Sequence, residues 1–180
     1  MTETKTVDVR ARQQALRERY KVAPAEAMIT DHARTVRGVK TDPFHGTVVP
    51  GSQDYGIEWP FGIHSAVGGD HDGPNPGDLL CAALATCLDS TIRIIANRLA
   101  IPLVALEVDV SAQVDTRGTL VVDRAVPVGF QTMRCQVTIQ PAEGTDPQLV
   151  ERLLAAAEYS CVNLQTLRSG VAVELGVTSS

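Results

Sequence analysis

The feature that most constrains the fold is an apolar run at residues 79–88, where almost every side of a helix would carry a small or hydrophobic side chain. Asn75 and Pro76 stand just before it, and they suit the cap and the first position of a helix. A helix that is apolar all round must be buried. The sequence therefore predicts a long core helix whose first half is enclosed and whose single polar stripe comes later, at Thr86, Asp89, Arg93 and Asn97.

Two later segments alternate apolar and polar residues, which is the pattern of a strand with one covered face. They span 104–114 and 133–139, and the turn at 115–118 lets them pair as a hairpin. Other β-prone pieces lie between glycines and prolines and predict a meander and a last strand, at 28–36, 47–49, 55–59 and 171–177.

Two more helices are predicted, one near the N-terminus at 7–20 and one at 149–159 that a capping-box pattern opens at Thr145–Gln148. The element order indicates an α+β protein, in which antiparallel sheets are covered by two buried core helices. A chain of 180 residues suits one such domain. We expect a helical extension at 1–24 and the domain proper at 25–180.

The charge pattern limits the partners. Sixteen basic and twenty-one acidic residues give a net charge of −5, and no basic stripe that would bind nucleic acid is evident. The N-terminus lacks the apolar core of a signal peptide. The apolar run at 79–88 is about half the ~20 residues that a membrane span needs. We expect a soluble, cytoplasmic protein that binds neither nucleic acid nor a membrane.

Four cysteines, at 81, 87, 135 and 161, lack the short-range Cys or His partners of zinc motifs. Cys81 and Cys87 point about 240° apart around a helix, so only one of them can share a site with Cys161. All four could equally be small buried hydrophobes, which is the commonest fate of free cysteine. Placement far apart along the chain favours thiol chemistry over metal binding.

Other candidate ligands form no site in the sequence. The four histidines, His32, His45, His64 and His71, are scattered without metal-binding spacing. Asp70 and Asp72 lack the remaining ligands of a calcium loop, and the Gly-rich loop before the core helix lacks the Lys and Ser/Thr of a nucleotide-binding loop. We expect neither a metal nor a cofactor.

The loop from Gly68 to Pro76, the helix that carries Ala85-Thr86-Cys87, and the later Tyr159-Ser160-Cys161 together resemble the OsmC/Ohr family of osmotically induced and organic-hydroperoxide-resistance proteins. The resemblance covers about 28–177. It implies a homodimer of intertwined α+β subunits with two active sites near the interface. The N-terminal helix is similar to an extension that only some relatives carry.

The resemblance also implies roles for individual residues. Cys87 would be the peroxidatic thiol that becomes a sulfenic acid, and Cys161 would resolve it as a disulfide. A thiol in apolar surroundings needs a cation to react as thiolate. The loop arginine of the family matches Arg37, with Arg34 and Lys40 as neighbouring substitutes. The substrate would be an organic hydroperoxide, and the reductant a dithiol, which a lipoyl-bearing protein could supply.

Two positions depart from the family pattern. Gly77 stands where the peroxidase branch has a glutamate that orients the arginine, and Val162 stands where a proline usually follows the second cysteine. Asp78 could replace the glutamate with a shorter reach, or it could cap the helix. These departures keep an alternative open: a dimeric protein of the same fold that binds an apolar ligand or senses redox state, without efficient peroxidase activity.

Overall fold

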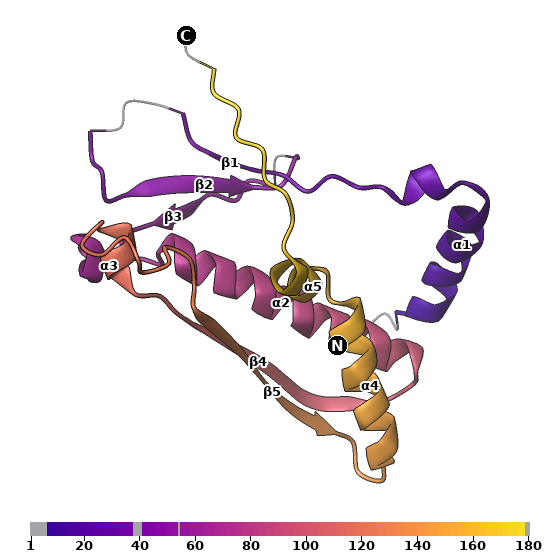
Figure 1. Cartoon of the computed structure of the whole chain (residues 1–180). Coiled ribbons are helices and arrows are strands. Elements are labelled where there is room, and N and C mark those ends of the chain that lie inside the picture. The colour runs from indigo at the N-terminus through magenta and orange to yellow at the C-terminus, as the bar shows by residue number, and fades with distance from the viewer. Residues whose placement is uncertain (1–6, 38–40, 54, 179–180) are drawn as a thin grey trace. The chain divides into compact units, whose positions relative to one another are not determined.

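The computed structural model describes residues 7–37, 41–53 and 55–178. They form two compact units. The first unit takes its described residues from Met1–Arg10, Ala83–Asp109 and Gln136–Ser180, and the second from Ala11–Ala82 and Val110–Cys135. Each unit is thus assembled from distant parts of the chain. The long helix α2 (Pro76–Arg98) and the strands β4 (Leu103–Gln113) and β5 (Thr132–Pro141), which Figure 1 labels, each contribute residues to both units.

The hydrophobic core lies in the first unit. Helix α4 (Pro147–Ser160) contributes Leu153 and Ala157, which are 0% and 1% exposed. Helix α2 contributes a stripe of side chains spaced three and four residues apart, which is the spacing of one helix face. The stripe consists of Leu84, Leu88, Ile92, Ile95 and Ala96. The prediction of two buried core helices within an α+β fold is confirmed.

The buried part of α2 is not the part that the sequence favoured. Burial begins at Leu84 and continues to Ala96, whereas Leu80 keeps 40% of its surface exposed. The prediction that the first half of this helix is enclosed is therefore wrong for the single chain. Helical rotation accounts for the difference, because a run that is apolar on all sides can bury only the side that meets another element.

The hairpin prediction is confirmed. Strands β4 and β5 form a two-stranded sheet. Its direction follows from its ends: the amide of Gln131 donates to Gln113 O, and the amide of Ala142 donates to Pro102 O. This pairing is antiparallel, since the end of one strand meets the start of the other. A short helix, α3 (Thr116–Thr119), capped by Asp115, occupies the predicted turn.

The second unit contains a three-stranded antiparallel sheet in the order β1–β2–β3. Its strands are β1 (Ala33–Thr35), β2 (Gly46–Pro50) and β3 (Trp59–Phe61). The predicted meander is confirmed, with shorter first and third strands than expected. Two 3₁₀ turns, η1 (Pro24–Ala27) and η2 (Ser65–Val67), connect the elements of this unit.

Helix α1 (Val9–Val22) matches the predicted N-terminal helix, and none of its residues is buried. The residues before and at its start bind the C-terminal end of α2 within the first unit. Asn97 accepts from the amide of Val9 and donates to Val7 O, and Arg10 donates to the carbonyl of Arg98. These contacts satisfy groups that every helix end leaves unpaired. The division of the chain at residue 24 stays a prediction, and residues 1–6 of the extension lie outside the described residues.

The C-terminal strand prediction is wrong. After Cys161 the chain forms a fifth helix, α5 (Val162–Ser169), that the sequence did not indicate. The amide of Gly170 closes its last turn, and residues 171–178 then continue without regular structure. Val173 and Leu175 are 86% and 91% exposed. An alternating pattern makes a strand only when a neighbouring strand supplies hydrogen bonds, and no described strand pairs with this segment.

By length and composition α2 could span a membrane, and among the described helices only α2 meets that test. The helix as a whole is therefore longer and more apolar than the run at 79–88 suggested. Its buried stripe forms the core of the first unit. It also carries an exposed ion pair between Asp89 and Arg93. These features are typical of the core helix of a globular protein.

Candidate active site

Helix α2 begins at a fully formed capping box. The side chain of Asn75 accepts hydrogen bonds from the amides of Gly77 (2.8 Å) and Asp78 (3.3 Å). In return, Asp78 Oδ2 accepts from the amide and the side-chain Nδ2 of Asn75, at 2.9 and 2.6 Å. The predicted cap at Asn75 is confirmed. The described contacts of Asp78 are those of a capping residue, and its role as an orienting carboxylate stays a prediction.

The sulfurs of Cys87 and Cys161 lie in direct contact in the first unit. The Cys161 thiol donates to Cys87 Sγ over 3.4 Å, although the two residues are 74 positions apart. No disulfide joins them, and both are thiols. This distance is too short for another atom to lie between the two sulfurs, so they are in van der Waals contact. A bridge between them needs only a small shortening of this distance.

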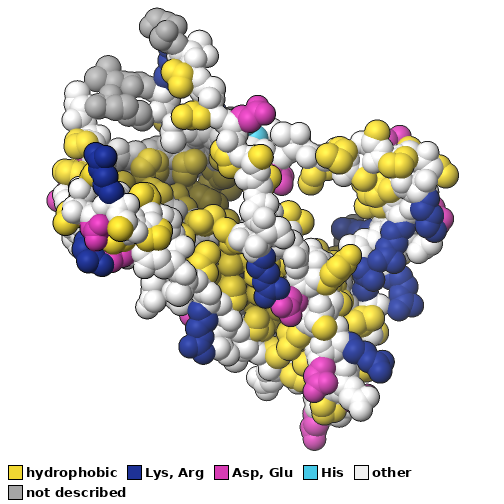
Figure 2. All heavy atoms as spheres, viewed as in Figure 1, with side chains coloured by type: hydrophobic (Ala, Val, Ile, Leu, Met, Phe, Trp, Pro, Cys, Tyr) yellow, Lys and Arg dark blue, Asp and Glu magenta, His cyan; other side chains and the backbone are white. Residues whose placement is uncertain are grey.

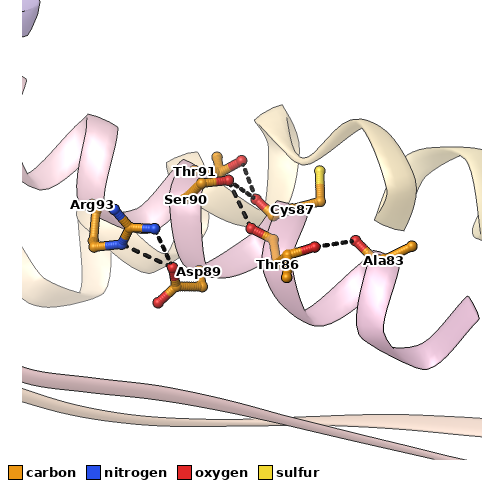
Figure 3. A network of polar contacts seen from close by, with 7 residues as sticks. All are labelled: Ala83, Thr86, Cys87, Asp89, Ser90, Thr91 and Arg93. Carbon is orange, nitrogen blue, oxygen red and sulfur yellow. Dashed lines mark hydrogen bonds and ion pairs between the residues drawn. The ribbon is translucent and has the colours of Figure 1, made fainter. Parts of the chain in front are cut away.

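Hydroxyl groups on the next turn of α2 hold the backbone of Cys87. Its carbonyl accepts from Thr91 Oγ1 at 2.7 Å and from Ser90 Oγ at 3.1 Å. Figure 3 shows the Cys87 side chain directed away from the ion pair between Asp89 and Arg93. The sulfur therefore lies off the polar stripe, on the side of α2 that meets Cys161.

The two thiols differ in exposure and in electrostatic surroundings. Cys161 is 0% exposed, whereas Cys87 is half-buried. Burial raises the pKa of the Cys161 thiol, and the contact with Cys87 raises it further, while the backbone amides of Leu164 and Asn163 act in the opposite direction. Cys161 is therefore held as a protonated thiol. A reagent from solvent reaches Cys87 first.

The remaining two cysteines belong to the second unit. Cys81 on α2 and Cys135 on β5 are both half-buried. Burial raises the pKa of the Cys81 thiol, and the charges of Asp78 and of an ionised Cys135 raise it further. Cys81 and Cys135 thus influence each other through space.

The arginine predicted to activate Cys87 lies in the other unit. Arg37 is exposed and follows strand β1, and Arg34 is an exposed residue within that strand. Lys40, the third candidate, lies outside the described residues. The structure brings Cys87 and Cys161 together, and the activating cation stays a prediction.

Gly77 is fixed by its packing in the second unit. A Cβ atom at this position would lie 2.9 Å from Asn75 Oδ1 and 3.0 Å from the ring of Phe130. The first distance is shorter than atoms of real side chains allow, and it involves the oxygen that caps the helix. A larger residue at 77 would therefore displace both the cap and the aromatic ring.

The histidines serve local structure. His45 bridges two aspartates, with Nδ1 at 2.7 Å from Asp42 and Nε2 at 3.0 Å from Asp72. Both hydrogen bonds raise the pKa of His45, and the one with Asp42 has the larger effect. His64 and His71 lie ring against ring, with centroids 4.0 Å apart. Within the described part of the chain, no group of three potential metal ligands is present.

One polar side chain near the thiols was missed by the sequence reasoning. Asn163, two residues after Cys161, donates from Nδ2 to Ala83 O over 2.7 Å. Ala83 lies one helical turn before Cys87. An asparagine in the first turn of a helix gives no signal of a contact 80 residues away, and helix α5 was itself unforeseen.

The model of the OsmC-like protein family matches residues 69–176, which is more than half of the chain. The chain belongs to the OsmC-like family. The match includes both Cys87 and Cys161. No curated protein matches the sequence.

Solved structures of OsmC-like proteins share the fold. An organic hydroperoxide resistance protein OsmC from Legionella pneumophila is 23% identical, with a TM-score of 0.56 over 78% of this chain and 90% of the other. An organic hydroperoxide resistance protein from Elizabethkingia anophelis is 19% identical, with a TM-score of 0.59 over 79% of this chain and 91% of the other. An OsmC-like protein of unknown function from Vibrio cholerae is 12% identical, with a TM-score of 0.62 over 77% of this chain and 94% of the other. At these identities the likeness establishes the fold of this OsmC-like chain.

Proposed function

We propose that the protein is a thiol peroxidase that reduces organic hydroperoxides through Cys87 and Cys161. The observation that carries the proposal is the 3.4 Å contact between the two sulfurs, one half-buried and the other fully buried. Membership of the OsmC-like family supports it. So do the names of two structural relatives as organic hydroperoxide resistance proteins.

The chemistry has three steps. The Cys87 thiolate attacks the distal oxygen of a hydroperoxide and the O–O bond breaks. The distal OH stays on sulfur as a sulfenic acid, and the remaining alkoxide takes a proton and leaves as an alcohol. The Cys161 thiol then attacks the sulfenic sulfur, and water leaves as the Cys87–Cys161 disulfide forms. A dithiol reductant restores both thiols by exchange and is itself oxidised to a disulfide. A lipoyl-bearing protein is one reductant of this class.

Two further residues complete the proposed site. Arg37 supplies the positive charge that favours the reactive thiolate. Asp78 is the remaining carboxylate that could orient this arginine in place of the glutamate absent at Gly77. In the structure Asp78 contacts Asn75 as a capping residue, so orienting the arginine would require its side chain to turn away from the cap.

We also propose a cytoplasmic homodimer that binds neither nucleic acid nor a membrane. The single chain leaves many large apolar side chains exposed, as the face in Figure 2 illustrates. Exposed apolar surface of this extent is typical of interaction sites. Next to Cys161, Tyr159 and Val162 are 83% and 68% exposed. Such surface suits an apolar hydroperoxide, a second copy of the chain, or both.

A second candidate function has specific support. Gly77 is held by Phe130 and Asn75, so this chain cannot place a glutamate there without rearranging the start of α2. Val162 replaces the usual proline, and one structural relative has no known function. These observations favour a dimeric protein that binds an apolar ligand or senses redox state.

One experiment separates the two functions. Stopped-flow mixing of the reduced protein with cumene hydroperoxide or hydrogen peroxide, followed by intact mass, measures thiol loss and its product. The peroxidase predicts fast reaction with the organic hydroperoxide, slower reaction with hydrogen peroxide, and loss of two hydrogens as Cys87 and Cys161 join. In Cys161→Ser the same treatment should add one oxygen and then a second. Failure of both peroxides to oxidise Cys87 would leave the ligand-binding or sensing function.

A further inference from the structure

The backbone of Cys161 is fixed at the junction of two helices. Its amide donates to Ala157 O at 2.9 Å, which ends α4, and its carbonyl accepts from the amide of Gln165 at 3.0 Å, which begins α5. The side chain of Gln165 reaches back across the junction to Glu158 O at 2.8 Å. Cys161 therefore lacks the freedom of movement that a residue after a helix end would have. Its sulfur can meet Cys87 only if the junction as a whole is held against α2.

Asn163 supplies that connection. Its Nδ2 donates to Ala83 O over 2.7 Å, and Thr86 Oγ1 donates to the same carbonyl over 3.2 Å. In an α-helix the carbonyl of residue 83 also receives the amide of Cys87. The hydrogen bond of Asn163 thus ends on the helical turn that leads directly into Cys87. Asn163 is half-buried and Ala83 is exposed, so this hydrogen bond lies at the surface of the first unit.

We propose that Asn163 is a positioning residue that holds the Cys161 junction against α2, so that Cys161 captures oxidised Cys87 before a second oxidation. The proposal rests on the proposed function. The sulfurs are 3.4 Å apart, and a disulfide needs a separation about 1.3 Å shorter. Cys161 must make this approach while Cys87 is a sulfenic acid. Loosening the junction lowers the fraction of time that the sulfurs are in reach.

Two reactions compete for the sulfenic acid. In the first, the Cys161 thiol displaces water and forms the disulfide. In the second, another hydroperoxide transfers an oxygen, leaves as an alcohol, and converts Cys87 to a sulfinic acid. Asn163 acts mainly on the first reaction, because Cys161 is a reactant in disulfide formation and not in the attack on hydroperoxide. The ratio of disulfide to sulfinic acid therefore reports the positioning role.

The test compares Asn163→Asp with Gln165→Glu. Both replace a half-buried amide of α5 by an acid of the same shape, but only Asn163 bonds to α2. In Asn163→Asp a carboxylate oxygen faces the Ala83 carbonyl in place of a donor. We expect the first oxidation of Cys87 to change less than twofold and disulfide formation to slow roughly 3- to 10-fold, the loss of one hydrogen bond. Sulfinic acid at Cys87 should rise accordingly. Gln165→Glu removes a contact within the junction but leaves the contact with α2, so it should change the partitioning much less than Asn163→Asp does.

Three outcomes would overturn the proposal: unchanged partitioning in Asn163→Asp, equal slowing of both steps, or an equal effect of Gln165→Glu. Circular dichroism shows whether Asn163→Asp folds. If it does not fold, Asn163→Ala replaces it in the test, and the same slowing of disulfide formation is expected. A parallel measurement with the azo oxidant diamide, which takes two hydrogens from a dithiol, needs no peroxide. With Cys81 and Cys135 changed to serine, slower closure by diamide in the variant supports the positioning role even if the wild type reduces no hydroperoxide.

Discussion

Cys81 and Cys87 lie six residues apart on the same helix and meet different surroundings. Cys87 touches the sulfur of Cys161 in the first unit, at a junction built by two further helices. Cys81 lies in the second unit, where Asp78 and Cys135 are its electrostatic neighbours and raise the pKa of its thiol in addition to burial. Both residues are half-buried thiols. The difference teaches that the surroundings of a thiol on this helix depend on what each turn faces.

The same contrast separates the capacity for redox cycling from simple oxidation. A sulfenic acid is converted to a disulfide when a second thiol is close enough to attack it. Cys87 has that partner at 3.4 Å. Negative charge beside Cys81 further disfavours its thiolate, which is the reactive form. The following predictions test this assignment, starting from the largest expected effect.

Exchanging the two cysteines one at a time is the strongest test. We expect Cys87→Ser to abolish hydroperoxide reduction and Cys81→Ser to keep it, since the sulfur of Cys87 is in contact with that of Cys161. A buried hydroxyl in place of the thiol costs on the order of 1–3 kcal/mol, so both variants should fold. Peroxide consumption with a dithiol reductant gives the activity, and thermal unfolding gives the stability. Loss of activity in Cys81→Ser alone would reverse the assignment.

A cation that activates Cys87 should matter for that thiol and not for Cys81. We expect Arg37→Ala to slow the first oxidation of Cys87, roughly tenfold at neutral pH, because a neighbouring positive charge favours the thiolate. The alkylation rate of Cys81 should stay the same. Stopped-flow oxidation and mass-resolved alkylation measure the two rates, and Arg34→Ala is the matched control. If Arg37→Ala leaves the oxidation rate of Cys87 unchanged, Arg37 does not activate this thiol, and Arg34 or Lys40 becomes the candidate cation.

The smallest effect concerns Asp78. The charge of Asp78 raises the pKa of the Cys81 thiol, after burial as the larger cause. Asp78→Asn should therefore lower that pKa and speed the alkylation of Cys81 about two- to threefold at pH 8, since more thiolate is present. If Asp78 only caps α2, the oxidation rate of Cys87 should change less than twofold. A large drop in the Cys87 rate would instead support Asp78 as the orienting carboxylate.

Local patterns decided much of the fold from the sequence. The capping box at Asn75, the period-two alternation of β4 and β5, and the helical period of α4 all depend on neighbours within a few residues. The C-terminal segment at 171–177 shows the limit of such reasoning. Its apolar residues recur at every second position as in β5, but a strand also needs a partner, which the segment itself does not specify.

The sequence by itself determined which thiols could not act together, because helix geometry separates Cys81 from Cys87 whatever surrounds them. It also provided the family resemblance that paired Cys87 with Cys161. Only the tertiary structure decided that the two sulfurs touch, that Cys161 is the buried one, and that Asn163 ties its junction to α2. These facts depend on contacts across 74 to 80 residues. Such contacts follow from the packing of whole helices, which no local pattern of residues encodes.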